Sequence, residues 1–216
     1  TTVGSLCCGR APRRAIVPIY GKRFLDCRNQ IENSTYVVVW GNNPAISKQG
    51  YFQRFEHVVE NGGKLVVIDP IYTESAAKAT DWLQPWPGTD AALGLAMLKV
   101  IVDERLYDEE FLLAHTCAPC LVDRATGEPV LKNADDPASF VVFDKKSGEV
   151  VPHDQSGIEA ALTLDGTDAA DAYQTEFELI VAEASAWDLA AAEEECGVPA
   201  ADIERIAKEY AGASTR

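Results

Sequence analysis

Two runs of consecutive apolar residues stand out along a chain in which apolar and polar positions otherwise alternate. Residues 36–40 and 65–68 are rich in β-branched side chains, a pattern typical of strands that are buried on both faces of a parallel sheet. Between these runs, apolar residues recur at helical spacing, and we expect a helix that follows an N-cap at Ser47 and ends at Gly62. The order strand, helix, strand predicts an α/β fold with a Rossmann-like parallel sheet flanked by helices.

After the second strand the pattern predicts a short helix over residues 74–79, then a short edge strand within residues 82–90. A long helix follows, with Thr89 or Asp90 as its cap. Its buried stripe consists of Leu93, Met97, Val100 and Ile101. We expect Asp108 to open the next helix, because acidic residues fill the first turn that follows it.

The pattern changes after residue 120. Residues 120–132 and 140–153 each read as two strands joined by a polar, glycine-containing turn, which predicts an antiparallel hairpin excursion. Helices return at residues 176–184 and 197–211, with Pro199 in the first turn of the second one. One face of this last helix holds Ile203, Ile206 and Tyr210. We find no internal repeat along the chain.

These elements divide the chain into four parts. We expect residues 1–35 to belong to a neighbouring domain, residues 36–119 to form an α/β nucleotide-binding core, residues 120–180 to form a hairpin-rich insertion, and residues 181–216 to return helices to the core. The first residue is threonine rather than methionine, and the chain stops abruptly. We therefore expect it to be a segment of a longer polypeptide.

Charge and composition limit the classes of function. With 34 acidic against 19 basic residues, the net charge of −15 disfavours a nucleic-acid partner, because phosphate binding needs a basic surface. No apolar stretch is long enough to span a bilayer, so we expect no membrane contact from this segment, and the sequence indicates no compartment. Six cysteines are too few for a disulfide scaffold. The lone CxxC of Cys117 and Cys120 reads either as two loop residues or as a weak metal-binding signal.

Candidate chemistry gathers in three polar segments that adjoin the predicted strands. The carboxyl ends of parallel strands share one edge of a sheet, where ligands bind in open α/β folds. The segments are residues 41–45, 69–73 and 87–90, and the Gly-Asn-Asn turn of the first can present backbone N–H groups to an anion. Asp69 can accept hydrogen bonds from ribose hydroxyls, and Asp90 can accept two from a guanine edge. Taken singly, these two acids also read as a turn former and a helix cap, and the GxGxxG signature of NAD and FAD sites is absent.

A family resemblance lies in two stretches, "VVVWGNNPA" and "GGKLVVIDPIYTESAAKATDWLQPWPGTDAALGLAMLKVIVDERLYDEEFL". Together they resemble the third domain of the molybdopterin oxidoreductases of the dimethyl sulfoxide reductase family, over residues 36–114. The closing "GVPAADIERIAKEYA" is similar to the same family. In that family this domain binds the guanosine half of a molybdopterin guanine dinucleotide. The resemblance therefore implies this cofactor, with molybdenum or tungsten as its metal.

The same resemblance implies roles for three sets of residues. The phosphates and sugar of the nucleotide would lie against Trp40, Gly41, Asn42, Asn43 and Pro44. The ribose would lie near Ile68, Asp69, Pro70 and Thr73. The guanine base would pair with Asp90, in a segment that also holds Pro87 and Gly88. Ile71 departs from the family pattern, because many relatives carry a basic residue there.

The resemblance also points to a metal ligand near the start of the chain. In cysteine- or selenocysteine-ligated relatives, the ligand precedes a glycine at a set interval, and Cys8 has the matching separation from Gly21. Cys8 would then supply the catalytic thiolate to the metal, for which a soft thiolate is a suitable ligand. Cys7 stands one residue away as an alternative, and both cysteines also read as plain thiols of a chain terminus.

The reaction implied for the intact protein is a two-electron redox step with oxygen-atom or hydroxyl transfer at the metal. We expect the segment alone to be inactive. Relatives carry further domains in the same polypeptide, often with an amino-terminal iron–sulfur cluster, and the resemblance also implies a separate partner, an electron-transfer subunit. Two other functions stay open: a non-redox, hydratase-type member of the family, and a cofactor-free α/β interaction module.

Overall fold

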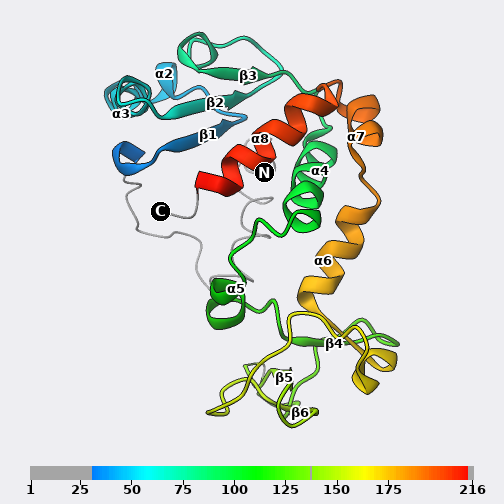
Figure 1. Cartoon of the computed structure of the whole chain (residues 1–216). Helices are drawn as coiled ribbons and strands as arrows, with labels where there is room; N and C mark the ends of the chain where they lie inside the picture. The colour runs from blue at the N-terminus through cyan, green and yellow to red at the C-terminus, as the bar shows by residue number, and fades with distance from the viewer. Residues whose placement is uncertain (1–30, 137, 214–216) are drawn as a thin grey trace, which may run out of the picture.

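The structure is a computed structural model that describes residues 31–136 and 138–213. A three-stranded parallel sheet forms the upper part of the molecule in Figure 1. Its strands are β1 (Tyr36–Trp40), β2 (Lys64–Ile68) and β3 (Asp81–Leu83). β2 lies between the other two and is parallel to both. The parallel sheet predicted from the two apolar runs is therefore confirmed, and the predicted edge strand is β3.

β2 is buried on both faces, because its side chains alternate between two separate clusters. Leu65 and Val67 are fully buried against α3 (Gln49–Glu60), which covers one face of the sheet with Phe52 and Phe55. The side chains between them point to the other face. A strand with two covered faces needs apolar residues at every position, which explains its unbroken apolar run.

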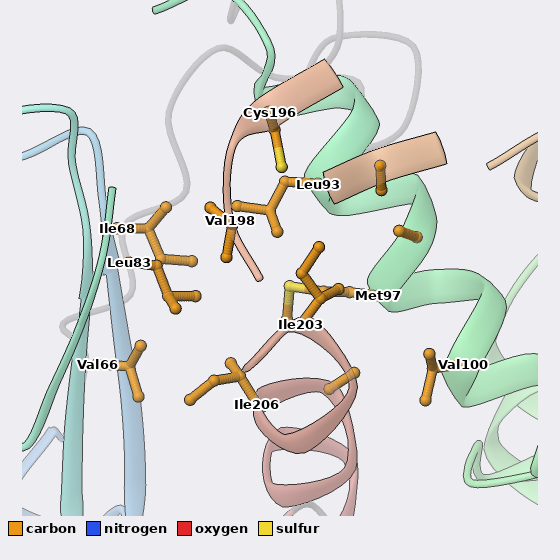
Figure 2. Close-up of a cluster of buried hydrophobic side chains, with 13 residues drawn as sticks. Val66, Ile68, Leu83, Leu93, Met97, Val100, Cys196, Val198, Ile203 and Ile206 are labelled. Atoms are coloured by element: carbon orange, nitrogen blue, oxygen red, sulfur yellow. The ribbon is translucent and has the colours of Figure 1, made fainter. Parts of the chain in front are cut away.

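Three helices cover the opposite face of the sheet: α4 (Asp90–Asp103), α7 (Leu189–Cys196) and α8 (Ala200–Ala213). Figure 2 shows side chains of β2 and β3 facing side chains of these helices in one cluster. Ile68 and Ile203 are both fully buried there. Because α7 and α8 come from the end of the chain, this half of the core closes only when the last residues pack.

One charged network ties α8 to all three strands. Lys64 Nζ of β2 lies 2.6 Å from Oε1 of Glu209, and the Tyr36 hydroxyl of β1 donates to Oε2 of the same carboxylate at 3.2 Å. Arg205 lies 2.9 Å from Asp81 of β3. Burial, together with the Glu209 charge, raises the pKa of the Tyr36 hydroxyl. Tyr36 therefore stays a neutral donor to this carboxylate.

The face predicted for the last helix is confirmed for two of its three residues. Ile203 and Ile206 are fully buried, whereas half of Tyr210 is exposed. The Tyr210 ring lies edge-on to Tyr36, with 6.3 Å between the ring centroids. Tyr210 therefore packs on the first strand and not in the core.

The helix after β1 begins earlier than its sequence predicts. A short helix, α2 (Pro44–Ser47), precedes α3, and Lys48 separates the two. The prediction of Ser47 as the N-cap is therefore wrong, and its hydroxyl donates to the backbone oxygen of Asn43 at 2.9 Å. Proline is favoured at the first position of a helix, and Pro44 accordingly starts α2 directly after the turn.

The predicted starts of three other helices have different outcomes. Asp108 is confirmed as the N-cap of α5 (Glu109–His115). The N-cap residue of α4 is Thr89, but neither Thr89 nor Asp90 caps that helix through its side chain. Pro199 lies one residue before α8 and not in its first turn. The backbone oxygen of Pro199 accepts from Asp202 N–H at 2.9 Å and from Ile203 N–H at 3.1 Å, so the helical hydrogen bonds begin at this residue.

The lower part of the molecule in Figure 1 is antiparallel. β5 (Val141–Asp144) and β6 (Glu149–Pro152) form the second predicted hairpin, which is confirmed. The first predicted hairpin is present in part: a bridge joins β4 (Leu121–Asp123) to the residues after its own turn, with Val130 N–H donating to Leu121 O at 2.9 Å and Asp123 N–H donating to Glu128 O at 3.0 Å. β4 also pairs along its length with β7 (Tyr173–Thr175), a strand that follows much later in the chain.

α6 (Glu176–Ser185) connects the antiparallel part to the helices on the sheet and packs against α4. Its amino terminus is a capping box: the Thr175 hydroxyl accepts from the backbone N–H of Glu178, and the Glu178 carboxylate accepts from the backbone N–H of Thr175. Three short 3₁₀ helices complete the described elements, namely η2 (Ile31–Asn33), η3 (Ala76–Lys78) and η4 (Asp168–Asp171).

Two turns of the antiparallel part are built alike. Residues 122–130 read "VDRATGEPV" and residues 143–151 read "FDKKSGEVV". In each, the carboxylate of the aspartate accepts from the hydroxyl and the backbone N–H of the residue three positions on. The next residue is a glycine, whose N–H donates to the aspartate backbone oxygen at 2.8 Å or 2.9 Å. The likeness is confined to these two turns and does not extend to a whole structural unit.

We expect Asp144→Asn to lower stability at neutral pH and to lose this effect in acid. The buried Asp144 carboxylate accepts hydrogen bonds from Glu159 N, Ser147 Oγ and two further backbone N–H groups, and these bonds lower its pKa to about 2. Because the folded-state pKa is lower than the unfolded one, the stabilisation is present above pH ~4 and is lost as the pH falls toward ~2. Urea unfolding from pH 7 to pH 3 would measure it.

Asp154 provides the matched control, because it lies in an exposed turn of the same hairpin region. Asp154→Asn makes the same chemical change at an exposed position and should leave the unfolding free energy at pH 7 within about 0.5 kcal/mol of the wild type. A constant difference between the wild type and Asp144→Asn over this range would contradict the assignment.

Among the helices of residues 31–136 and 138–213, none has the length and apolar character needed to cross a membrane. The fold class predicted from the sequence, an α/β sheet with an antiparallel excursion, is confirmed. The division of the chain into four parts remains a prediction.

Candidate functional site

Three loops meet at the carboxyl edge of the sheet. Because the three strands are parallel, the loops that follow them leave from the same side. Backbone hydrogen bonds hold the loop starts to the neighbouring strands: Gly41 N–H donates to Ile68 O at 2.8 Å, and Asp69 N–H donates to Leu83 O at 3.1 Å. The three segments predicted from the sequence are therefore adjacent in the structure. The loop residues at this edge of the sheet, 40–45, 69–75 and 86–90, are called the rim below.

A direct side-chain contact joins the first and third loops. The indole Nε1–H of Trp40 donates to Oδ1 of Asp90 at 2.6 Å, across fifty positions of sequence. Both residues are exposed, and Asp90 is the first residue of α4. The Trp40 ring also lies against α4, 3.7 Å from the place where a Cβ of Gly94 would be. The Asp90 carboxylate therefore has a fixed position at the rim, although it does not cap its helix.

Asn43 joins the first loop to the segment after β2. Its Nδ2 donates to Glu74 Oε2 at 2.8 Å, and its Oδ1 accepts from the Ser75 hydroxyl at 2.7 Å. Ser75 is fully buried and its hydroxyl also accepts from Ala45 N–H at 3.1 Å. The Asn43 bond lowers the pKa of the Glu74 carboxyl. The amide of Asn43 is thus used within the protein, and it shapes the loop.

The second loop is a tight turn. Oδ1 of Asp69 accepts from Ile71 N–H at 2.9 Å, so this acid forms the turn that its sequence allows. The backbone oxygens of Asp69 and Pro70 accept from the side chains of Trp82 at 2.9 Å and Gln84 at 3.0 Å. Thr73 accepts from Ala76 N–H at the start of η3, the 3₁₀ helix that takes the place of the predicted helix over residues 74–79.

The third loop, which holds Pro87 and Gly88, rests on the end of α7. Trp86 N–H donates to the backbone oxygen of Cys196 at 2.9 Å, and the Trp86 ring lies over Gly197. The Thr89 hydroxyl donates to Trp86 O at 2.7 Å. The last helices of the core therefore support the loop that carries Asp90.

The predicted site residues differ in how far they are exposed to solvent. Pro44 and Ile68 are buried, so the Ile68 side chain belongs to the core and only its backbone reaches the rim. Asn43, Asp69, Pro70 and Thr73 are partly buried in the loop contacts. The exposed members of the set are Trp40, Gly41, Asn42, Pro87, Gly88 and Asp90. Gly41 has φ +59°, and a Cβ there would meet nothing within 4 Å, so its backbone is open to close approach.

Sequence reasoning missed four residues that build this rim. Glu74 and Ser75 hold Asn43 in place, and Trp86 and Gly197 support the third loop. For the first two, the polar cluster directly after the second loop was the available signal. No local pattern links Trp86 to Gly197, because their contact depends on the packing of α7.

The proposed metal ligand Cys8, its alternative Cys7 and Gly21 lie outside the described residues. In the part of the chain that the structure describes, no group of three or more His, Cys, Asp or Glu side chains could hold a metal ion. Cys117 and Cys120 belong to no such group among the described residues.

The fold is therefore that of an α/β protein. Hydrogen bonds hold its loops together at the edge of the sheet where such proteins bind ligands. The family described as molybdopterin oxidoreductase matches residues 4–183. The chain is 36% identical over 187 residues to the putative dimethyl sulfoxide reductase catalytic subunit of Halobacterium salinarum, covering 81% of the chain and 22% of that protein. It is 34% identical over 149 residues to the alpha subunit of the respiratory nitrate reductase of Haloferax mediterranei, covering 68% and 15%.

The chain therefore belongs to the molybdopterin oxidoreductase family. Among solved structures, acetylene hydratase from Pelobacter acetylenicus shares its fold with a TM-score of 0.60 at 22% identity, covering 100% of this chain and 21% of that one. The chain spans between 15% and 22% of the length of these relatives. The resemblance read from the sequence is confirmed at the level of the family.

Proposed function

We propose that this chain, within its full-length protein, holds the guanosine half of a molybdopterin guanine dinucleotide at the rim of the parallel sheet. The observation that carries the proposal is the fixed Asp90 carboxylate, which Trp40 holds beside the open backbone of the first loop. A carboxylate is the acceptor that suits the two adjacent N–H groups of a guanine edge. The rim thus offers a base-reading group next to a backbone that a phosphate or sugar can approach.

The other rim residues fit the same ligand. Gly41 and Asn42 are exposed and flexible enough in conformation to turn N–H groups toward an anion. Asp69 uses Oδ1 for its own turn, which leaves Oδ2 as the acceptor for a ribose hydroxyl. Asn43 and Pro44 act by shaping the loop, since the amide of one is bound to Glu74 and Ser75 and the ring of the other is buried.

For the full-length protein we infer a molybdenum or tungsten oxidoreductase whose remaining domains enclose the rest of the cofactor. The bound cofactor supplies the two-electron redox centre. Cys8 is the proposed thiolate ligand of the metal, and the proposed partners are an amino-terminal iron–sulfur cluster and an electron-transfer subunit. The two relatives compared above are named as reductases, which favours redox chemistry.

Replacing Asp90 by asparagine in the full-length protein tests the proposal. Asparagine can still accept from Trp40, but its NH₂ group would face the guanine donors in place of an oxygen. Loss of a hydrogen-bonded charge costs about 1.5–3 kcal/mol, or about 10- to 150-fold in affinity. We therefore expect the purified variant to carry much less cofactor, measured as GMP released by acid hydrolysis per protein chain.

Asp103→Asn is the matched control, because Asp103 is the last residue of the same helix and lies far from the rim. It should retain the wild-type amount of GMP. Wild-type GMP content in Asp90→Asn, at an unchanged melting temperature, would remove the base-reading role of Asp90.

The hydratase-type alternative assigns the same cofactor-binding role to the rim and differs only in the reaction at the metal. The fold is also that of acetylene hydratase, so the fold alone does not separate the two. Consumption of a reduced electron donor by the full-length protein would support the oxidoreductase. Full-length protein that is purified anaerobically without metal or pterin would instead support the interaction module.

A further inference from the structure

Cys117 and Cys120 occupy the two ends of one tight turn between α5 and β4. The backbone N–H of Cys120 donates to Cys117 O at 2.8 Å, which closes a four-residue turn around Ala118 and Pro119. In such turns the first and last Cα atoms lie within about 7 Å of each other. A disulfide spans Cα distances of about 4.4–6.8 Å. The turn therefore holds the two cysteines at a separation that a disulfide can bridge.

The two thiols differ in their surroundings. Cys117 is exposed, whereas Cys120 is buried and lines a cavity of about 570 Å³ between α5 and the β5–β6 hairpin, together with Thr116, Pro119 and His153. The other cysteine of the described residues, Cys196, is fully buried in the core at the end of α7. Cys117 is thus the thiol that a solvent reagent reaches first.

We propose that Cys117 and Cys120 form a reversible disulfide by exchange with low-molecular-weight disulfides such as oxidised glutathione. The Cys117 thiolate attacks one sulfur of the glutathione disulfide, forms a mixed disulfide and releases one glutathione thiolate. Cys120 then loses its proton, its sulfur attacks the Cys117 sulfur, and the second glutathione thiolate leaves. Two protein thiols are oxidised to one disulfide, and one glutathione disulfide is reduced to two thiols.

The electrostatics of the turn set the order of the two steps. Burial, with smaller contributions from the neighbouring Cys117 and from Glu176, raises the pKa of the Cys120 thiol to about 11. The thiolate is the nucleophile, so the exposed Cys117 makes the first attack and Cys120 resolves the mixed disulfide.

The disulfide would fix a junction of the fold. Cys120 O accepts from Glu176 N–H at 2.9 Å, and Ala118 O accepts from Phe177 N–H at 3.0 Å, so the turn holds the first residues of α6. Phe177 packs with Ala118 and Leu162 in a cluster at this place. Oxidation would therefore restrain the joint where the antiparallel part meets the helices on the sheet.

Alkylation mass spectrometry on the full-length protein tests the proposal. Trypsin cleaves after Arg105 and Arg124, and the peptide between them contains Cys117 and Cys120 and no other cysteine. After equilibration in glutathione buffers, free thiols are blocked with N-ethylmaleimide before digestion. We expect the unalkylated peptide, lighter than the dithiol by two hydrogen atoms, to rise at least about tenfold from a reducing to an oxidising buffer.

Single variants separate the exchange mechanism from unspecific oxidation. Cys120→Ser should stop at the mixed disulfide of Cys117 with glutathione, and Cys117→Ser, a change at an exposed position, should leave the buried Cys120 as an unmodified thiol that N-ethylmaleimide alkylates after unfolding. The proposal is overturned if the wild-type peptide remains doubly alkylated in oxidising buffer. It is equally overturned if the wild type accumulates the glutathione adduct without the internal disulfide.

Discussion

Gly197→Ala lowers the free energy of unfolding by about 2–5 kcal/mol, as the sum of two effects. Gly197 ends α7 in the left-handed region, at φ +75°, where any residue with a Cβ costs about 1–2 kcal/mol. The new Cβ would also lie 2.8 Å from Cε2 and Nε1 of the Trp86 indole, closer than atoms pack, and overpacking costs about 1–3 kcal/mol. Urea unfolding measures the sum.

A double-mutant cycle separates these two effects. In a Trp86→Ala background the steric conflict is gone and only the backbone cost remains, so Gly197→Ala should cost about 1–3 kcal/mol less there than in the wild type. Gly212→Ala in α8 is the matched control. A Cβ at Gly212 meets nothing within 4 Å, and alanine is the better helix former, so this variant should be neutral or up to ~1 kcal/mol more stable. Equal costs of Gly197→Ala in both backgrounds would show that the indole is not in the way.

The steric conflict has a consequence for the rim as well. Trp86 begins the loop that leads to Asp90, and its N–H donates to Cys196 O next to Gly197. An indole that is pushed aside by the new methyl group would move this loop. In the full-length protein we therefore expect Gly197→Ala to lose GMP content together with stability, whereas Asp90→Asn should lose GMP content alone.

Those parts of the fold that depend on local pattern could be predicted from the sequence. Consecutive β-branched residues predict the buried strands, and the acidic residues that follow Asp108 predict the start of α5. α7 gives no such signal, because it contributes mainly small side chains to the core, Ala192 and Cys196, within a run of alanines and glutamates. The pairing of β4 with β7 gives no local signal either, because β7 follows much later in the chain.

The candidate site shows the same division. Its position followed from topology alone, since loops after parallel strands must share an edge. Its internal contacts did not, because the Trp40–Asp90 bond joins residues fifty positions apart and the Asn43–Ser75 bond joins residues thirty-two apart. By residue type, Asp90 and Ser47 are both favoured as helix caps. In the structure the Asp90 carboxylate accepts from Trp40 and the Ser47 hydroxyl donates to Asn43 O instead.

Ile68→Ala is expected to lower the free energy of unfolding by about 3 kcal/mol, and its effect on the rim should follow from this loss. The Ile68 side chain is fully buried among Leu83, Leu93 and Ile203, and truncation of such a side chain leaves a cavity that costs about 2–5 kcal/mol. Figure 2 shows it pointing from the sheet into the helices. The backbone oxygen that binds Gly41 N–H is unaffected by the substitution.

Ile71 is the matched control for this variant, because the same substitution three residues later removes the same atoms from an exposed position. Ile71 is 69% exposed, so Ile71→Ala should change the unfolding free energy by no more than about 0.5 kcal/mol. Urea unfolding measures the loss of stability in both variants. GMP analysis of the full-length variants shows whether either substitution also affects cofactor binding. If Ile68→Ala kept wild-type stability but lost GMP, its side chain would be acting on the ligand, and the assignment of Ile68 to the core would have to be given up.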